Sequence, residues 1–217
     1  MRTERDDARL DFVRPARPVT LSLVCGRGHY DTVIGAVRGA RLGVWIATAN
    51  LKELMVEDDR WSSRRRRGRQ AAYRSMIGVF SDLVASRVEI RLLHAAPPSR
   101  AFREELGRHP ELLAGLRRKA PALRPNALFE MRACPRVHLK AVVVDGRFLY
   151  LGSANWTGAG LGAKGTGRRN FELGLVTDDT LLLDDVRELF DRIWRGAECG
   201  ACKLRAECPG PLDRVTA

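Results

Sequence analysis

Short apolar runs alternate with amphipathic segments along most of the chain. Continuous apolar runs at 42–49 and 88–94 are typical of strands buried in the centre of a sheet, and 18–25 is a further predicted strand. Elsewhere, apolar residues recur at helical spacing. These segments predict helices over 30–41, 70–86, 100–116 and 181–194. Strands that alternate with helices indicate an α/β domain.

The pattern changes after residue 127, where strands follow one another closely. Runs at 128–134, 137–145 and 147–155 predict three strands, and a Gly-rich stretch at 157–167 leads into a fourth at 171–177. Asp145-Gly146 between apolar strands is a strong signal for a two-residue hairpin turn. A hairpin added to alternating strands and helices predicts a mixed sheet.

The chain divides into three parts by composition. Residues 1–17 are polar and charged and predict an N-terminal arm, 18–196 form the main domain, and 197–217 form a Cys-rich tail. A length of 217 residues is sufficient for one well-packed domain. No apolar run approaches the roughly 18 residues of a membrane span, and the N-terminus has no apolar signal region. We therefore expect a soluble, cytoplasmic protein.

The predicted hairpin gathers polar residues that a core strand would not need. A two-residue turn at Asp145-Gly146 sets Val144 opposite Arg147, and Asp145 itself is expected to hold the turn by hydrogen bonds. Side chains on a strand repeat every two residues, so alternate positions share one face. The residues that share the polar face of this hairpin are His138, Lys140, Ser153 and Asn155.

This group of residues fits attack on a phosphodiester. The imidazole of His138 can attack phosphorus to form a phosphohistidine, which divides one difficult displacement into two easier ones. Lys140, Ser153 and Asn155 would stabilise the charge that spreads over the phosphoryl oxygens. Glu172, on the next strand, is expected to hydrogen-bond the other ring nitrogen of His138 and fix its tautomer.

The same residues resemble the HKD motif of the phospholipase D superfamily, over about residues 18–196. The motif reads His138-x-Lys140-x4-Asp145, followed by Gly152-Ser153-Ala154-Asn155 and Asn170-Phe171-Glu172. The resemblance implies a phospholipase D-like α/β/α sandwich and a reaction that needs no metal or other cofactor. In that family a second motif histidine protonates the leaving oxygen. Because this sequence holds one copy, resemblance to single-motif members implies a homodimer with a shared active site.

Charge favours nucleic acid as the substrate. Lys and Arg number 38 against 26 Asp and Glu, which gives a net charge of +12 and predicts a polyanionic partner. The basic residues expected to contact backbone phosphates are Arg64, Arg65, Arg66, Arg67, Arg69, Lys164, Arg168 and Arg169. The arginine run is equally compatible with a solvated loop. Trp61 and Trp156 are possible stacking surfaces for bases, although core packing is the better interpretation for Trp156.

Two other functions remain open at this point. The motif also serves phospholipases and phosphatidyltransferases, so membrane lipid is an alternative substrate. Against it stands the lack of an anchor or an obvious amphipathic apolar surface helix. A binding module with a decayed active site is a third interpretation, although every motif residue is present.

The tail carries three of the five cysteines in the sequence. Cys199-x2-Cys202-x5-Cys208 has the spacing of a thiolate metal site, and it is similar to the end of the iron–sulfur module in some RecB-type exonucleases. A fourth ligand would be Cys134 or Cys25. An iron–sulfur cluster and zinc are the competing occupants, either of them structural, and three reduced thiols in the tail are the plain alternative.

Overall fold

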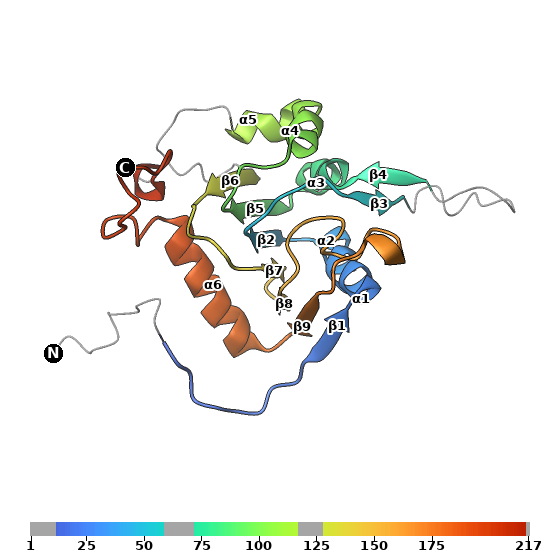
Figure 1. The fold of residues 1–217 in the computed structure, drawn as a ribbon, viewed down its shortest axis with the longest axis horizontal. Coiled ribbons are helices and arrows are strands. Elements are labelled where there is room, and N and C mark those ends of the chain that lie inside the picture. The colour runs from blue at the N-terminus through green and yellow to red at the C-terminus, as the bar shows by residue number, and fades with distance from the viewer. Residues whose placement is uncertain (1–11, 59–71, 117–127, 216–217) are drawn as a thin grey trace, which may run out of the picture.

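A seven-stranded sheet forms the centre of the computed structural model, which describes residues 12–58, 72–116 and 128–215 (Figure 1). The strand order is β1-β9-β8-β7-β2-β5-β6. β2, β5 and β6 run parallel, whereas β7, β8, β9 and β1 pair antiparallel, so the sheet is mixed as predicted. The strands are β1 (Ser22–Cys25), β2 (Gly43–Thr48), β5 (Glu89–His94), β6 (Phe129–Ala133), β7 (Ala141–Val144), β8 (Phe148–Gly152) and β9 (Leu173–Thr177).

Helices cover both faces of the sheet, which gives the expected α/β/α layering (Figure 1). One face carries α1 (Arg27–His29), a π-helical turn (Tyr30–Ile34), α2 (Gly35–Arg38), α3 (Met76–Ala85), α4 (Arg100–Gly107) and α5 (Pro110–Leu116). The other carries the longest helix, α6 (Thr180–Trp194), and short 3-10 helices lie at Thr166–Arg168 and Leu212–Val215. No helix in the described ranges combines the length and hydropathy that a membrane crossing needs.

The alternation of buried side chains along β2 explains its continuous apolar sequence. Val44 and Ile46 are buried in the larger core, on the side of α3. Trp45 and Ala47 point to the opposite face, where the Trp45 ring stacks on Phe190 of α6 with centroids 5.2 Å apart. Both faces of the central strand are therefore covered, and no polar face is needed.

A short strand, β4 (Tyr73–Ser75), replaces the described start of the helix predicted over 70–86, and residues 70 and 71 lie outside the described part of the chain. β3 (Met55–Glu57) pairs antiparallel with β4, and α3 begins only at Met76. The side chain of Ser75 accepts hydrogen bonds from the backbone N–H groups of Ile77 and Gly78. Such a cap satisfies the donors of a helix start, so it sets the helix boundary that the apolar spacing alone does not.

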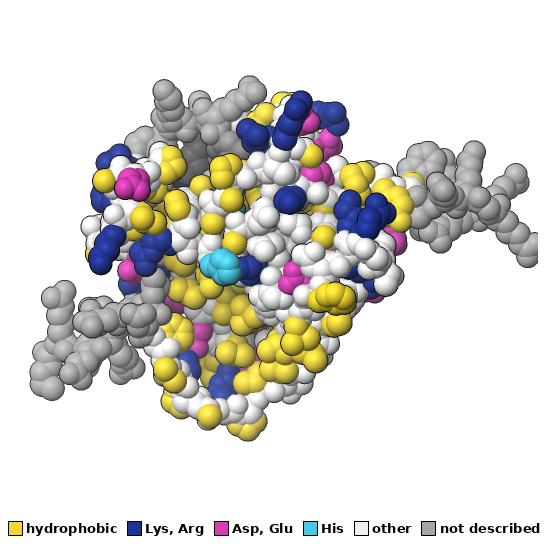
Figure 2. Space-filling model, viewed as in Figure 1, with side chains coloured by type: hydrophobic (Ala, Val, Ile, Leu, Met, Phe, Trp, Pro, Cys, Tyr) yellow, Lys and Arg dark blue, Asp and Glu magenta, His cyan; other side chains and the backbone are white. Residues whose placement is uncertain are grey.

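The α6 side of the sheet is left uncovered at β9 and β1. Leu23 of β1 pairs with Leu175 of β9, and Leu175 pairs in turn with Leu151 of β8, so the three form one row. Leu23 is 64% exposed and Leu175 39% exposed. Figure 2, in the orientation of Figure 1, shows hydrophobic side chains gathered over the region of β9 and β1.

The N-terminal segment reaches α6 through ion pairs. Arg14 lies 2.6 Å from Asp185, and Arg17 pairs with Asp179, the residue that caps α6. Residues 1–11 of the predicted arm lie outside the described part of the chain. The described part of the arm, from residue 12, therefore runs along the surface of the domain to β1.

Candidate active site

The hairpin that carries the motif has a different register from the one predicted. Val144 pairs with Phe148 rather than with Arg147, so the loop holds three residues. Asp145 and Gly146 both have positive φ, at 53° and 64°, and the N–H of Arg147 donates to the Val144 carbonyl at 3.0 Å. The tight turn predicted by Asp-Gly is present, but Arg147 follows it as one extra residue, which shifts the pairing by one.

The shift changes where the reactive residues sit relative to the strands. The Gly152 N–H donates to the Lys140 carbonyl at 3.1 Å, so Lys140 lies opposite Gly152. A two-residue turn would have set Lys140 opposite Leu151. β7 begins only at Ala141, and His138 therefore precedes the strand. The motif residues stand at the edge of the sheet, where the chain leaves regular pairing.

Asp145 ties the hairpin to the start of β2. Its carboxylate accepts hydrogen bonds from three backbone N–H groups. The donors are Arg41 at 2.9 Å, Leu42 at 2.7 Å and Gly43 at 2.9 Å. Partial burial alone would raise the pKa of Asp145, but the three donors stabilise the carboxylate and lower it. Asp145 thus holds the fold at the end of β7 opposite to His138.

His138 and Lys140 lie in direct contact. The Lys140 ammonium is 3.0 Å from Nδ1 and 3.1 Å from Nε2 of the His138 ring, and it donates to the His138 carbonyl at 2.8 Å. The His138 side chain is exposed, so a substrate has access to it. Burial lowers the pKa of Lys140, and the negative charge of Glu172 partly offsets that effect. An exposed imidazole and a cation therefore share one surface position.

Ser153 and Glu172 form a second pair. The Ser153 hydroxyl donates to the Glu172 carboxylate and accepts from the Leu173 N–H at 3.1 Å. The other carboxylate oxygen accepts from Asn170 Nδ2 at 3.0 Å. The hydrogen bonds of Glu172 thus run to Ser153 and Asn170, and the expected bond to His138 stays a prediction.

Asn155 is oriented by the end of β2. Its Oδ1 accepts from the Asn50 N–H at 3.0 Å and lies 3.3 Å from Thr48 Oγ1. These contacts engage the amide oxygen and so fix the orientation of the Asn155 amide group. Sequence reasoning missed Thr48 and Asn50 as site residues. The available signal was their polarity at the end of the apolar run of β2. Asn170 belongs to the quoted motif, but its hydrogen bond to Glu172 was not predicted.

A buried histidine lies under this group and was also missed. His29 is fully buried, and its Nδ1 is 3.3 Å from the Gly26 carbonyl oxygen. Its ring meets the edge of Tyr150, with centroids 5.6 Å apart. Burial lowers the pKa of His29 and raises that of Tyr150 to about 12, and the charge of Glu172 acts on both. Both rings are therefore near enough to Glu172 to sense its charge.

Only some of the basic residues predicted to contact backbone phosphates lie in the described part of the chain. Lys164 and Arg168 are exposed in the loop between Asn155 and Glu172, and Arg169 in the same loop donates to the Lys164 carbonyl at 2.6 Å. The run from Arg64 to Arg69 and Trp61 fall outside the described residues. Trp156 is buried and stacks on Phe80 at 5.9 Å, so it packs in the core and is not a surface for bases.

The predicted metal ligands of the tail lie near the segment that leads from Cys134 to His138. Cys134, Cys199, Cys202 and Cys208 line one pocket, whereas Cys25 is exposed on β1. Of the two cysteines considered as a fourth ligand, Cys134 is the one close to the tail. Within the described residues, no set of three or more His, Cys, Asp or Glu side chains already stands in metal-binding geometry.

Comparisons with known proteins agree with this architecture. A family model described as "Cardiolipin synthase, PLD-like domain" matches residues 72–194. NucT from Helicobacter pylori is 15% identical with a TM-score of 0.50, covering 81% of this chain and 95% of that one. Nuc from Salmonella typhimurium, a phospholipase D family member, is 14% identical with a TM-score of 0.51 and the same coverage. A polyphosphate kinase from Porphyromonas gingivalis is 15% identical with a TM-score of 0.50, covering 82% and 26%. The search of curated proteins gives no match.

Proposed function

This chain belongs to the phospholipase D-like domain family, and we propose that within it the protein is a metal-independent nuclease that cleaves DNA or RNA. The observation that carries the proposal is the exposed His138 ring with the Lys140 ammonium 3.0 Å away. The cation attracts a phosphate to the nucleophile, and the net charge of +12 favours a polyanionic substrate over a neutral one.

The reaction proceeds in two displacements. A ring nitrogen of His138 attacks phosphorus, a P–N bond forms, and the P–O bond to the leaving nucleotide breaks. The partner subunit's His138 gives its proton to the leaving oxygen. Water then attacks the phosphohistidine and loses a proton to the same partner histidine, and the P–N bond breaks. Lys140 and the Asn155 amide stabilise the phosphoryl oxygens in both steps.

A homodimer supplies the second histidine. This sequence holds one copy of the motif, so we propose that the acid comes from a second copy of this chain. Leu23 and Leu175 present an exposed apolar row on β1 and β9, and Leu173 beside Glu172 is 55% exposed. Apolar patches of this kind are typical of protein interfaces. We therefore propose that a second copy covers this row and contributes its own His138 to a shared active site.

A lipid-directed enzyme is the second candidate. The matching family model is described as a cardiolipin synthase, and the exposed apolar row that suits a second copy also suits an acyl chain. The same His138 and Lys140 chemistry would then act on a phospholipid headgroup. The high positive charge is weak evidence for this candidate, because anionic membranes attract any basic protein whether or not it acts on lipid.

One incubation series separates these functions. The protein is mixed with single- and double-stranded DNA and RNA in excess EDTA, and separately with vesicles of phosphatidylcholine and of cardiolipin. We expect cleavage of a polynucleotide that survives EDTA, falls about 1,000-fold or more in His138→Ala, and is unchanged in the control His109→Ala. Acid quenching should trap a phosphorylated His138, visible by mass spectrometry.

The other outcomes contradict the proposal in distinct ways. Products from vesicles alone would identify a lipid enzyme. Tight binding of polynucleotide without turnover in any condition would identify a binding module. Full activity of a folded His138→Ala variant would overturn the assignment of the nucleophile.

A further inference from the structure

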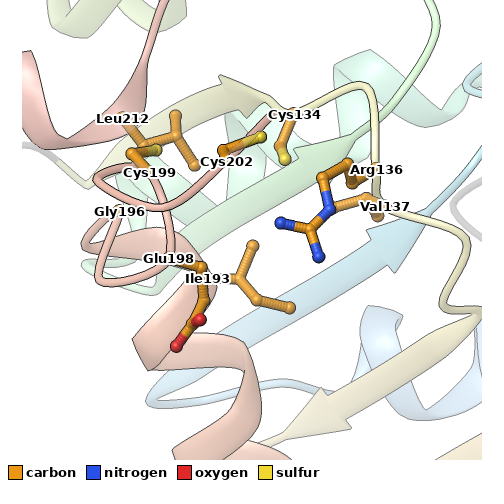
Figure 3. Close-up of a pocket in the computed structure, with 9 residues that line it drawn as sticks. All are labelled: Cys134, Arg136, Val137, Ile193, Gly196, Glu198, Cys199, Cys202 and Leu212. Atoms are coloured by element: carbon orange, nitrogen blue, oxygen red, sulfur yellow. The ribbon is translucent and has the colours of Figure 1, made fainter. Parts of the chain in front are cut away.

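Four of the five cysteines border one cavity between the tail and the active-site segment. Cys134 directly follows β6, and Cys199, Cys202 and Cys208 come from the tail, some 65 or more residues later in the chain. Figure 3 shows a neighbouring pocket that Cys134, Cys199 and Cys202 also line, with the sulfur atoms of Cys134 and Cys202 on the same side. Two segments distant in sequence thus present their thiols to one space.

The tail reaches this position through tight turns. The Cys199 N–H donates to the Gly196 carbonyl at 2.9 Å, and the Cys202 N–H donates to the Cys199 carbonyl at 3.3 Å. The turn from Cys199 to Cys202 brings the two thiols of the C-x2-C pair to the same cavity. Metal-binding knuckles use this spacing because both sulfurs can then reach one ion.

The two ends of the tail are anchored around the cavity. Gly196 has φ of 72°, and a side chain there would meet the Asp213 nitrogen at 2.2 Å, so the chain passes very close to itself at this point. Leu212 is buried with Phe190 and Trp194 of α6. Between these anchors the described tail has no strand or α-helix, and a cross-link is the usual way to stabilise such a segment.

The four thiols of the cavity are free and half-buried, whereas the fifth, Cys25, is exposed. Sulfur ligands gathered from two segments can reach one ion. A soft metal ion is the cation that thiolates bind best.

We propose that Cys134, Cys199, Cys202 and Cys208 together hold one metal centre, either a zinc ion or an iron–sulfur cluster, that fastens the tail to the active-site segment. Each thiol loses its proton to solvent as its sulfur binds the metal. The sulfurs do not yet stand in ligating geometry, so metal binding draws the tail toward Cys134. This inference does not depend on the proposed nuclease activity.

The centre stabilises the chain that leads to the nucleophile. The Cys134 N–H donates to the His94 carbonyl at 2.8 Å, and the Val137 N–H donates to the Cys134 carbonyl at 2.9 Å. His138 is the next residue after Val137. A metal bound at Cys134 therefore restrains the backbone of the active site without touching the substrate.

Metal content tests the proposal directly. The full chain is purified under nitrogen and measured by inductively coupled plasma mass spectrometry and visible absorption. We expect about one zinc per chain, or iron and sulfide with a charge-transfer band that zinc lacks. Cys134→Ser and Cys202→Ser should lose most of the metal, whereas Cys25→Ser, the matched control outside the cavity, should keep it.

A thiol assay covers the case in which the serine variants fail to fold. Metal-stripped wild-type protein is titrated with Zn²⁺ while free thiols are counted with a chromogenic disulfide reagent. Protection of four thiols, with Cys25 still reactive by mass spectrometry, supports the site. The proposal is overturned if Zn²⁺ and reconstitution with iron and sulfide protect no thiols, if Cys25→Ser loses as much metal as Cys134→Ser, or if two of the four form a disulfide in protein purified under nitrogen.

Discussion

Two buried histidines bind backbone carbonyls through one ring nitrogen each. His29 Nδ1 lies near the Gly26 oxygen, and His94 Nδ1 is 2.9 Å from the Ala96 oxygen. Within the described residues, His29 Nε2 is buried and has no hydrogen-bond partner, so a proton there would be poorly solvated. Burial lowers the pKa of both side chains below the ordinary value of 6.5.

These two residues make stability depend on pH. In the unfolded chain each histidine binds a proton near its ordinary pKa of 6.5, whereas the folded protein binds it only at lower pH. Stability should therefore fall as the pH drops below about 6.5, by at most about 1.4 kcal/mol per pH unit and per histidine. Thermal unfolding between about pH 7.5 and pH 5 measures this, and His29→Phe should reduce the slope. An equal slope in wild type and His29→Phe would show that His29 contributes nothing.

The Asp145 carboxylate gives a second residue-scale prediction. Asp145→Ala leaves three backbone N–H groups without their acceptor and should destabilise the fold by roughly 2–3 kcal/mol in urea unfolding. Asp145→Asn keeps one acceptor oxygen and should cost less. Asp184→Ala, at an exposed carboxylate, is the control and should change little. If Asp145→Ala matched that control, the hydrogen bonds would have no net effect on stability.

At this scale the sequence predicts the reactive residues but not those that orient them. His138, Lys140 and Ser153 are recognisable because their types and spacing are fixed by the chemistry. Thr48 and Asn50 contact Asn155 from 107 and 105 residues away, and one of them does so through its backbone N–H. No local pattern encodes such a contact, because any residue except proline can provide a backbone donor.

Strands β8 and β9 approach each other closely where Tyr150 crosses them. A Cβ at Gly174 would lie 2.2 Å from Tyr150 Cε2, and a Cβ at Gly152 would lie 2.4 Å from Tyr150 Oη. Gly152 and Gly174 are paired across the two strands. The phenol therefore occupies the space that two side chains would fill, directly beside the Ser153 and Glu172 pair.

Gly174→Ala should consequently destabilise the protein by about 1–3 kcal/mol, because the ring cannot move out of a packed core without loss. Gly167→Ala, where nothing lies within 4 Å of the added Cβ, is the matched control and should stay within about 0.5 kcal/mol. Urea unfolding of both variants measures the difference. Equal stabilities would mean that Tyr150 has room to shift.

Element types are predictable here, and element boundaries are less so. The apolar runs locate β2, β5 and β9 because burial dictates their composition. The predicted hairpin register is wrong by one residue. The positive φ values of Asp145 and Gly146 fit a two-residue loop, but they also fit a three-residue loop that includes Arg147. The choice depends on pairing across the sheet, which the dipeptide does not encode.

For the whole molecule, the uncovered row on β1 and β9 predicts association. Light scattering after size exclusion should give twice the 24.2 kDa of one chain. Leu175→Lys places a charge in the proposed interface and should shift the protein to monomer with loss of nuclease activity. Leu42→Lys, at an equally apolar residue that is 68% exposed and outside the row, should leave both unchanged. A monomeric wild type that cleaves at full rate would remove the need for a partner histidine.

The order of strands in the sheet also bears on how the protein is made. β1 precedes the other described strands of the sheet in the sequence, yet its partner is β9, with Ser22 opposite Val176. The parallel strands β2, β5 and β6 find one another much earlier during synthesis, while β1 waits for most of the chain to emerge. The apolar row shared by Leu23 and Leu175 therefore forms only after β9 has been translated. Until then β1 lacks its partner strand, and an unpaired strand edge favours association between incomplete chains.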